Sequence, residues 1–252
     1  MITVDLPSSE ALEAASFAFT FALIGIGAVI VASAIAAATW ARSLNAWALG
    51  GVSFVLSQTA QVVTLFLFGP LLAAFTSAPL HEASRAIILS TAARGVRDER
   101  PRAAFGLGHG AIDLLTSSLI PTLSAVIILG GIRDGSIFAG LDADVTERVN
   151  AVAVFLASQT LLSGALLVVQ GGLMLVLHAL LTAFVVRAVV RGGGARMIGR
   201  GLLLPVAIHT PVAVVRTLFP TSTMPVLLVA VLVAVLAYRR GQGPTEELPA
   251  SQ

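Results

Sequence analysis

Seven side chains of kinds that carry chemistry lie inside long apolar stretches of this chain. They are His81, Glu82, Arg85, His109, Asp113, His178 and His209. Imidazole and carboxylate groups act as general acids and bases and also bind zinc. A charged side chain at the centre of a bilayer costs at least about 2.5–3.5 kcal/mol. Their presence in apolar segments therefore predicts a polar site buried among membrane helices.

Glu82 and Arg85 are three residues apart, so they share one face of a helix. They could form an ion pair whose only role is to neutralise both charges. Alternatively, Arg85 orients the carboxylate of Glu82 so that it can act as a general base or a ligand. His81 precedes Glu82 but points about 100° away around the helix, as the helical repeat requires.

His109 and Asp113 lie four residues apart in the sequence FGLGHGAID, again on one helix face. Gly106 and Gly110 flank His109 with the spacing that lets a second helix approach closely. We expect this neighbour to be a helix such as the preceding one, which carries Glu82. A packing motif with a His–Asp hydrogen bond is the alternative to a catalytic or ligand role.

His178 and His209 each stand alone in apolar surroundings, where a single hydrogen bond to another helix would account for either one. Pro205 and Pro211 flank His209 and are expected to bend its helix near the site. Glutamines in other apolar segments are interpreted as interhelical hydrogen-bonding residues. They are Gln58, Gln61 and Gln170.

The composition places the chain in the membrane. Of its 252 residues, 57% are hydrophobic and 11% are charged, whereas soluble domains carry about 25% charged residues. All 15 basic residues are arginines and there is no cysteine. The lack of cysteine excludes disulfides and thiolate metal sites. The arginines are expected in cytoplasmic loops, so no nucleic-acid partner is expected.

We predict an all-α, polytopic membrane helix bundle of about seven transmembrane helices in the cell membrane. The expected spans are 14–40, 46–68, 71–93, 103–130, 163–190, 201–215 and 224–237. Arginine-rich boundaries alternate with acidic or short ones, which indicates an external N-terminus and a cytoplasmic C-terminus. The bundle then covers 14–240, between an external segment, 1–13, and a disordered cytoplasmic tail, 241–252. The stretch 149–162 is expected to be an interfacial or re-entrant helix.

Five of the polar residues are expected at similar depth. Counted from the cytoplasmic helix ends, they lie between about 10 and 19 Å into the membrane at 1.5 Å per residue. This is the central zone of a hydrocarbon core about 30 Å thick. They are Glu82, His109, Asp113, His178 and His209.

These motifs resemble those of the YhfC family of glutamic-type intramembrane proteases, relatives of the CAAX-processing and bacteriocin-immunity membrane proteases. The family pattern is a Glu-Glu-x-x-Arg helix, a GHGG-x-E helix and two later helices with one histidine each. Glu82 and Arg85 match the second Glu and the Arg, and His109 matches the GHG histidine. Asp113 takes the place of the Glu, and His178 and His209 resemble the later pair, so the likeness spans roughly 71–213.

The chain departs from the family pattern at three sites, one of them a pair of residues. His81 stands where the family has its first Glu, Gln170 and Gly171 replace an expected Glu-Arg pair, and Ala213 replaces an Asp. The resemblance implies hydrolysis of peptide bonds in membrane-associated substrates without a metal or other cofactor. Glu82, aided by His109, would be the general base. The departures leave open a divergent protease or a relative without catalytic activity.

The resemblance also implies that His178 or His209 donates a hydrogen bond to the oxyanion, with Arg85, Asp113 and His81 in support. Two other functions are compatible with the same residues. A zinc-binding membrane protein or metalloprotease would use the histidines with His81 or Glu82 as ligands. A proton- or ion-coupled transporter would use histidine and acidic side chains as relays.

Overall fold

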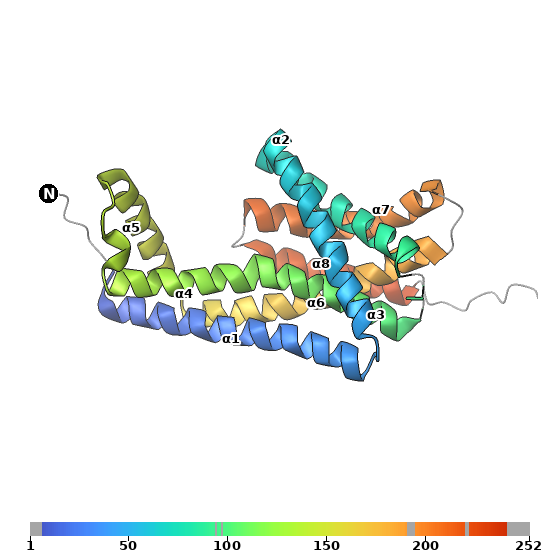
Figure 1. Cartoon of the computed structure of the whole chain (residues 1–252), viewed down its shortest axis with the longest axis horizontal. Coiled ribbons are helices and arrows are strands. Elements are labelled where there is room, and N and C mark those ends of the chain that lie inside the picture. Colours follow the sequence, from blue (N-terminus) through green and yellow to red (C-terminus); the bar gives the residue numbers. More distant parts are fainter. Residues whose placement is uncertain (1–6, 94, 97, 191–194, 220–221, 241–252) are drawn as a thin grey trace, which may run out of the picture. The chain divides into compact units, whose positions relative to one another are not determined.

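The computed structural model describes residues 7–93, 95–96, 98–190, 195–219 and 222–240. In those ranges the secondary structure is helical, without a strand (Figure 1). The α-helices are α1 (Ser9–Thr39), α2 (Leu44–Thr91), α3 (Glu99–Leu114), α4 (Ile120–Arg133), α5 (Ala143–Ala157), α6 (Leu161–Val190), α7 (Ala195–Leu218) and α8 (Thr223–Arg240). The prediction of a polytopic helical bundle is confirmed.

Six stretches of the described chain are long and apolar enough to cross a membrane. They are Ser9–Thr39, Leu44–Thr91, Glu99–Arg133, Leu161–Val190, Gly199–Leu218 and Thr223–Arg240. The seven predicted spans map onto these six, because α2 contains two of them. A straight helix of 48 residues would be about 72 Å long, more than twice the hydrocarbon thickness of about 30 Å.

α2 is a hairpin of two antiparallel helical arms, 44–68 and 70–91. At the bend Gly69 has φ 80° and ψ 176°, a conformation that is open essentially only to glycine. Hydrogen bonds across the two arms fix their direction. The Ser77 hydroxyl donates to Gln61 Oε1 at 3.3 Å, and Ser57 Oγ lies 3.0 Å from His81 Nδ1. In sequence, both pairs are symmetric about Gly69, and Figure 1 shows α2 turning back on itself.

The predicted fourth span is not one uniform helix. α3 ends at Leu114, a π-helical turn covers Leu115–Leu119, and α4 follows with Pro121 in its first turn. Proline has no N–H to donate to the carbonyl four residues earlier, and the wider turn occupies the region where that bond would form. The kink expected at Pro121 is therefore a π turn, a feature frequent near functional sites.

The chain divides into two compact units, one of Met1–Ala32 with Asp113–Gly172 and one of Ser33–Ile112 with Leu173–Gln252. The first unit has its own buried core on α1, α4 and α5, whose members include Ala15, Leu129 and Ala153.

α5 begins after Asp142, whose side chain accepts a hydrogen bond from the Val145 amide. It lies earlier than the predicted 149–162 helix, and its interfacial or re-entrant placement remains a prediction.

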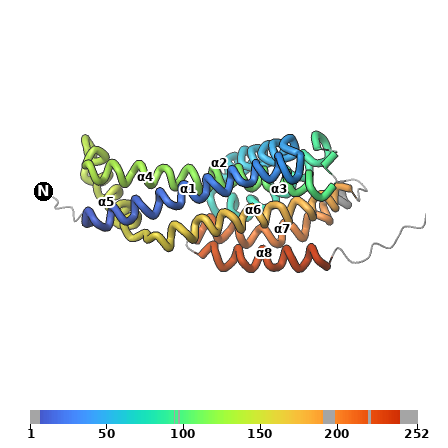
Figure 2. Tube along the Cα trace, turned by 90° about the horizontal axis from the view of Figure 1, so that it is seen from below, coloured from blue at the N-terminus to red at the C-terminus, as the bar shows by residue number. Residues whose placement is uncertain are grey.

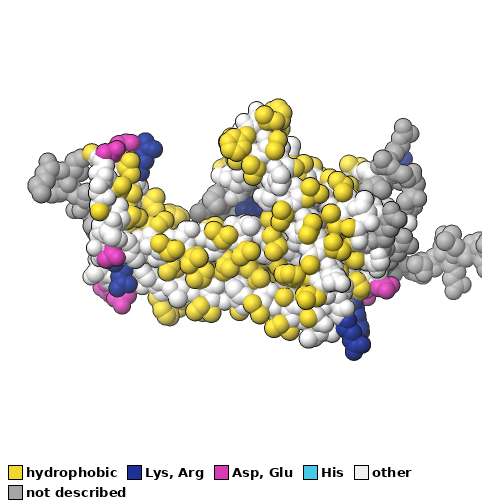
Figure 3. Space-filling model, viewed as in Figure 1, with side chains coloured by type: hydrophobic (Ala, Val, Ile, Leu, Met, Phe, Trp, Pro, Cys, Tyr) yellow, Lys and Arg dark blue, Asp and Glu magenta, His cyan; other side chains and the backbone are white. Residues whose placement is uncertain are grey.

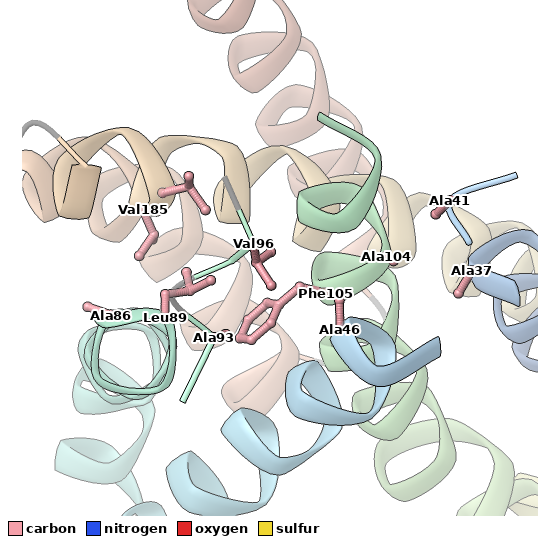
Figure 4. Close-up of a cluster of buried hydrophobic side chains, with 11 residues drawn as sticks. Ala37, Ala41, Ala46, Ala86, Leu89, Ala93, Val96, Ala104, Phe105 and Val185 are labelled. Atoms are coloured by element: carbon pink, nitrogen blue, oxygen red, sulfur yellow. The ribbon is translucent and has the colours of Figure 1, made fainter. Parts of the chain in front are cut away.

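The second unit has a core built mostly from small residues around one large ring. Phe105 of α3 is fully buried with Ala46 and Leu89 of α2 and Val185 of α6 (Figure 4). Alanine at these positions permits close helix packing. In the same unit α7 and α8 lie side by side (Figure 2).

The outer surface suits a lipid environment. Large hydrophobic side chains such as Phe66 (85% exposed) and Leu204 (45%) point outward, and hydrophobic side chains cover much of the face in Figure 3. The chain is therefore a multi-pass membrane protein.

α1 begins at Ser9, within the segment predicted to be external. The orientation remains a prediction, and the tail 241–252 and residues 1–6 lie outside the described residues.

Candidate functional site

Four helices of the second unit bring six of the seven predicted polar residues together. The second arm of α2 supplies three of them, and α3, α6 and α7 supply one histidine each. Each side chain is at most 2% exposed. The members of this polar cluster are His81, Glu82, Arg85, His109, His178 and His209. It includes all four histidines of the chain.

Glu82 and Arg85 form the charged centre of the cluster. Arg85 Nη1 donates to Glu82 Oε1 at 2.6 Å, and His209 Nδ1 lies 2.9 Å from the same oxygen. Arg85 Nη2 also donates to His178 Nδ1. Glu82 Oε2 and Arg85 Nε are buried and find no hydrogen-bond partner among the described residues. One open acceptor and one open donor thus lie one helical turn apart, where such groups are costly unless a ligand or water satisfies them.

The hydrogen-bond partners of His109 assign the position of its proton. Ser53 donates its single hydroxyl hydrogen to the Gly50 carbonyl at 2.7 Å. Ser53 Oγ therefore accepts from His109 Nδ1, also at 2.7 Å. In a neutral imidazole the other nitrogen is then an acceptor. Since His81 Nδ1 lies 2.9 Å from His109 Nε2, His81 is the donor of that bond.

The same reasoning extends to the surroundings of His81. Ser57 donates its hydroxyl hydrogen to the Phe54 carbonyl at 2.6 Å, so its oxygen accepts from His81 Nδ1, whose single hydrogen is shared between Ser57 Oγ and His109 Nε2. His81 Nε2 is left as an acceptor, and Gln58 Nε2 lies 3.4 Å from it. The Phe54 ring packs against His81 and His109 at centroid distances of 5.3 and 5.4 Å. These contacts hold both imidazoles in one orientation and tautomer.

Gly106 and Gly110 bring α3 against α6, and this corrects the predicted neighbour. A Cβ on Gly106 would lie 2.5 Å from Ala179 Cα, and one on Gly110 would lie 2.9 Å from Leu175 and 3.0 Å from His178. The expected crossing with the helix of Glu82 through these glycines is therefore wrong. Their role in bringing His109 to a neighbouring helix is real, because His109 and His178 have ring centroids 5.0 Å apart.

Asp113 lies on the last turn of α3 and is 1% exposed. The hydroxyls of Thr116 and Ser117 donate to its backbone carbonyl at 3.1 and 2.7 Å. The residue belongs to the first compact unit and the polar cluster to the second. A supporting role for its carboxylate remains a prediction.

The four imidazoles are close together but are not arranged around an ion. Their ring centroids are 5.0–6.4 Å apart in the pairs that contact each other. In the described part of the chain, no three His, Cys, Asp or Glu side chains could hold a metal ion as they are placed. As they are placed, Arg85 occupies His178 Nδ1, His81 faces His109 Nε2, and His209 Nδ1 bonds Glu82, so these nitrogens are not directed at a common ion. The residues therefore do not fit a metal in this arrangement.

Ser53 and Ser57 belong to the candidate site but were missed by the sequence interpretation. Both are buried and contact the imidazoles. A signal was present, because Ser53, Ser57 and Gln61 recur every four residues in an otherwise apolar segment and so share one helix face. The interhelical role expected of Gln61 is confirmed by its bond from Ser77 across the hairpin.

A comparison with protein families finds that residues 14–235 match the family described as YhfC intramembrane metalloprotease. Neither a curated protein nor a solved structure matches the chain. The match covers most of the 252 residues and confirms the family predicted from Glu82, Arg85 and the FGLGHGAID motif. The description names a metalloprotease, whereas the resemblance implied a glutamic type, and that distinction remains untested. The chain belongs to the YhfC intramembrane metalloprotease family.

Proposed function

We propose that this protein is an endopeptidase of the cell membrane that hydrolyses peptide bonds in membrane-associated proteins, with Glu82 as its general base. The family description supports an intramembrane protease. The observation that carries the assignment to Glu82 is the state of its two oxygens. Oε1 is held by Arg85 and His209, while the buried Oε2 has no hydrogen-bond partner in the described part of the chain. A fixed carboxylate with one open oxygen is suited to hold and deprotonate a water.

The proposed reaction uses one water per peptide bond. Glu82 Oε2 takes a proton as the water oxygen bonds to the carbonyl carbon, and a tetrahedral intermediate forms. The carbon–nitrogen bond then breaks, and the proton passes from Glu82 to the leaving amine. No described residue accepts a hydrogen bond from Arg85 Nε, so it is a candidate donor to the oxyanion, as preorganised N–H groups are in such reactions.

The histidines take more limited roles than the resemblance implies. Both nitrogens of His109 are engaged, by Ser53 and His81, so we interpret it as a positioning residue. His178 Nδ1 accepts from Arg85 and His209 Nδ1 donates to Glu82, so we interpret these two histidines as residues that hold the charged pair in position. With the cluster at most 2% exposed, the helices must separate locally before a peptide enters.

The experiment is cleavage of a library of single transmembrane segments in liposomes containing the full chain, read by mass spectrometry in H₂¹⁸O. Hydrolysis places one ¹⁸O on the new carboxyl terminus. Glu82→Gln should lower the rate at least 100-fold, consistent with loss of a general base. The matched control Glu147→Gln changes an exposed residue of α5 and should leave the rate unchanged. Cleavage that persists in Glu82→Gln would refute the assignment.

A metal-dependent form of the same activity is the second candidate, favoured by the family description and by four histidines in one cluster. Imidazole and carboxylate are suitable zinc ligands, and a bound zinc would supply Lewis acidity. Binding would first require the hydrogen bonds of Arg85 and the histidines to rearrange. For that reason we favour the carboxylate as the base.

A further inference from the structure

The polar cluster is connected to the protein surface by a row of side chains between the two arms of α2. Gln58 Nε2 reaches His81 Nε2 at 3.4 Å and donates to Gln61 Oε1 at 3.2 Å. Gln61 Oε1 also accepts from Ser77 at 3.3 Å. Hydrogen bonds therefore link the buried imidazoles to two amides of the first arm.

Exposure changes along this row. His81 and Ser57 are 1% exposed and Ser77 is 3% exposed, whereas Gln58 and Gln61 are half-buried. Their neighbours on the same arm, Val62 and Leu65, are 47% and 45% exposed, as expected of lipid-facing residues. An amide facing hydrocarbon without water would leave donors or acceptors unsatisfied, which costs several kcal/mol per group. Two adjacent half-buried amides in this segment thus indicate a wetted position.

We propose that Gln58 and Gln61 form a polar entrance through which water reaches the cluster of His81, Glu82 and His109. Hydrolysis consumes one water per bond, and a site buried among membrane helices cannot draw that water from lipid. The amides supply hydrogen-bonding groups where the route opens, and Ser57 and His81 continue it inward. Gln61 is eight residues from the hairpin bend, about 12 Å along the arm, so the entrance opens toward the bend.

Cysteine accessibility tests this proposal directly, because the chain contains no cysteine. Gln61→Cys and Val62→Cys are prepared in the full chain and treated with a small, charged methanethiosulfonate. The reagent is water-soluble and reacts with thiolate, which forms only in a polar environment. We expect Gln61→Cys to react at least 10-fold faster than Val62→Cys, although Val62 is the more exposed of the two to the surroundings. Equal rates, or slower reaction at Gln61→Cys, would overturn the proposal.

A second variant pair separates water entry from packing. Gln61→Leu should lower the turnover number at least 10-fold with little change in KM, since the substrate does not need the amide for binding. Thr59→Leu is the control, because Thr59 is exposed on the same arm and its hydroxyl donates to the Val55 carbonyl. An unchanged turnover number in Gln61→Leu would contradict the proposal. The turnover test rests on the proposed protease function, whereas the labelling rates do not. If Gln61→Cys is labelled fast but no substrate is cleaved, the proposed water entrance is supported and the proposed protease function is contradicted.

Discussion

Replacing Arg85 by methionine tests whether the charged centre holds the four helices together. Methionine keeps much of the side-chain volume but removes the guanidinium. Glu82 would then lose its 2.6 Å partner and keep only His209 Nδ1 at 2.9 Å. Removal of one member of a buried ion pair typically costs about 3–5 kcal/mol, because the other charge is left uncompensated. Since both side chains are fully buried, we expect a loss of unfolding free energy in that range.

The double variant Glu82→Gln with Arg85→Met removes both charges and should recover part of this loss. Replacing a whole buried pair is often nearly neutral, so the double variant should be more stable than Arg85→Met alone. The expected coupling free energy in the double-mutant cycle is about 2–3 kcal/mol, the upper part of the usual range for contacting residues. Unfolding by SDS in mixed micelles can be followed by the fluorescence of Trp47, whose indole donates to Ser33 at 3.2 Å.

Additive effects of the two substitutions would refute this account. A coupling free energy below about 0.5 kcal/mol is what independent sites give, and it would mean that Glu82 and Arg85 do not depend on each other. The same result would weaken the proposed base, because Arg85 would then not hold the Glu82 carboxylate in its orientation.

Two further predictions concern packing and metal. Gly108→Ala should lower the unfolding free energy by about 1–3 kcal/mol, since a Cβ there overlaps the Trp47 backbone. Gly172→Ala, which meets nothing within 4 Å, should be neutral or stabilise by about 0.5–1 kcal/mol, the gain for alanine over glycine inside a helix. A zinc chelator should leave both the melting temperature and the cleavage rate unchanged, and metal analysis of the purified protein should find no stoichiometric zinc. Stoichiometric zinc that is lost in His109→Ala would contradict the metal-free arrangement.

Much of the fold was predictable from the sequence because membrane helices follow local rules. The lengths of the apolar segments predicted the membrane spans. The pair Gly69-Pro70 predicted the break between the two spans that lie within α2. The bend itself needed only the conformational freedom of Gly69. The π turn at Leu115–Leu119 was not predictable, since Pro121 indicates that a helix is disturbed but not how the backbone adapts.

The sequence was sufficient to predict which residues form the candidate site, but not which of them contact one another. Depth along a helix follows from residue counting, so side chains at one depth can be identified without a structure. The neighbours of each helix, in contrast, are decided by packing between segments that are distant in the sequence. For this reason Gly106 and Gly110 were assigned to the wrong neighbour, although their small size correctly indicated close approach. The hydrogen-bonding serines were missed because each was judged singly, although Ser53, Ser57 and Gln61 recur every four residues on one helix face.

The histidine at position 81 has a clearer physical meaning in the structure than in the sequence. The family resemblance places a carboxylate there, and a carboxylate can only accept hydrogen bonds when ionised. His81 Nδ1 instead presents its hydrogen to both His109 Nε2 and Ser57 Oγ, since the hydroxyls of Ser53 and Ser57 donate to backbone carbonyls. Within the polar cluster, the negative charge of Glu82 is then balanced by the positive charge of Arg85. A second carboxylate would add an uncompensated charge in a medium where this is costly. A neutral imidazole at this position adds no charge, which is consistent with the proposed role of Glu82 as the base.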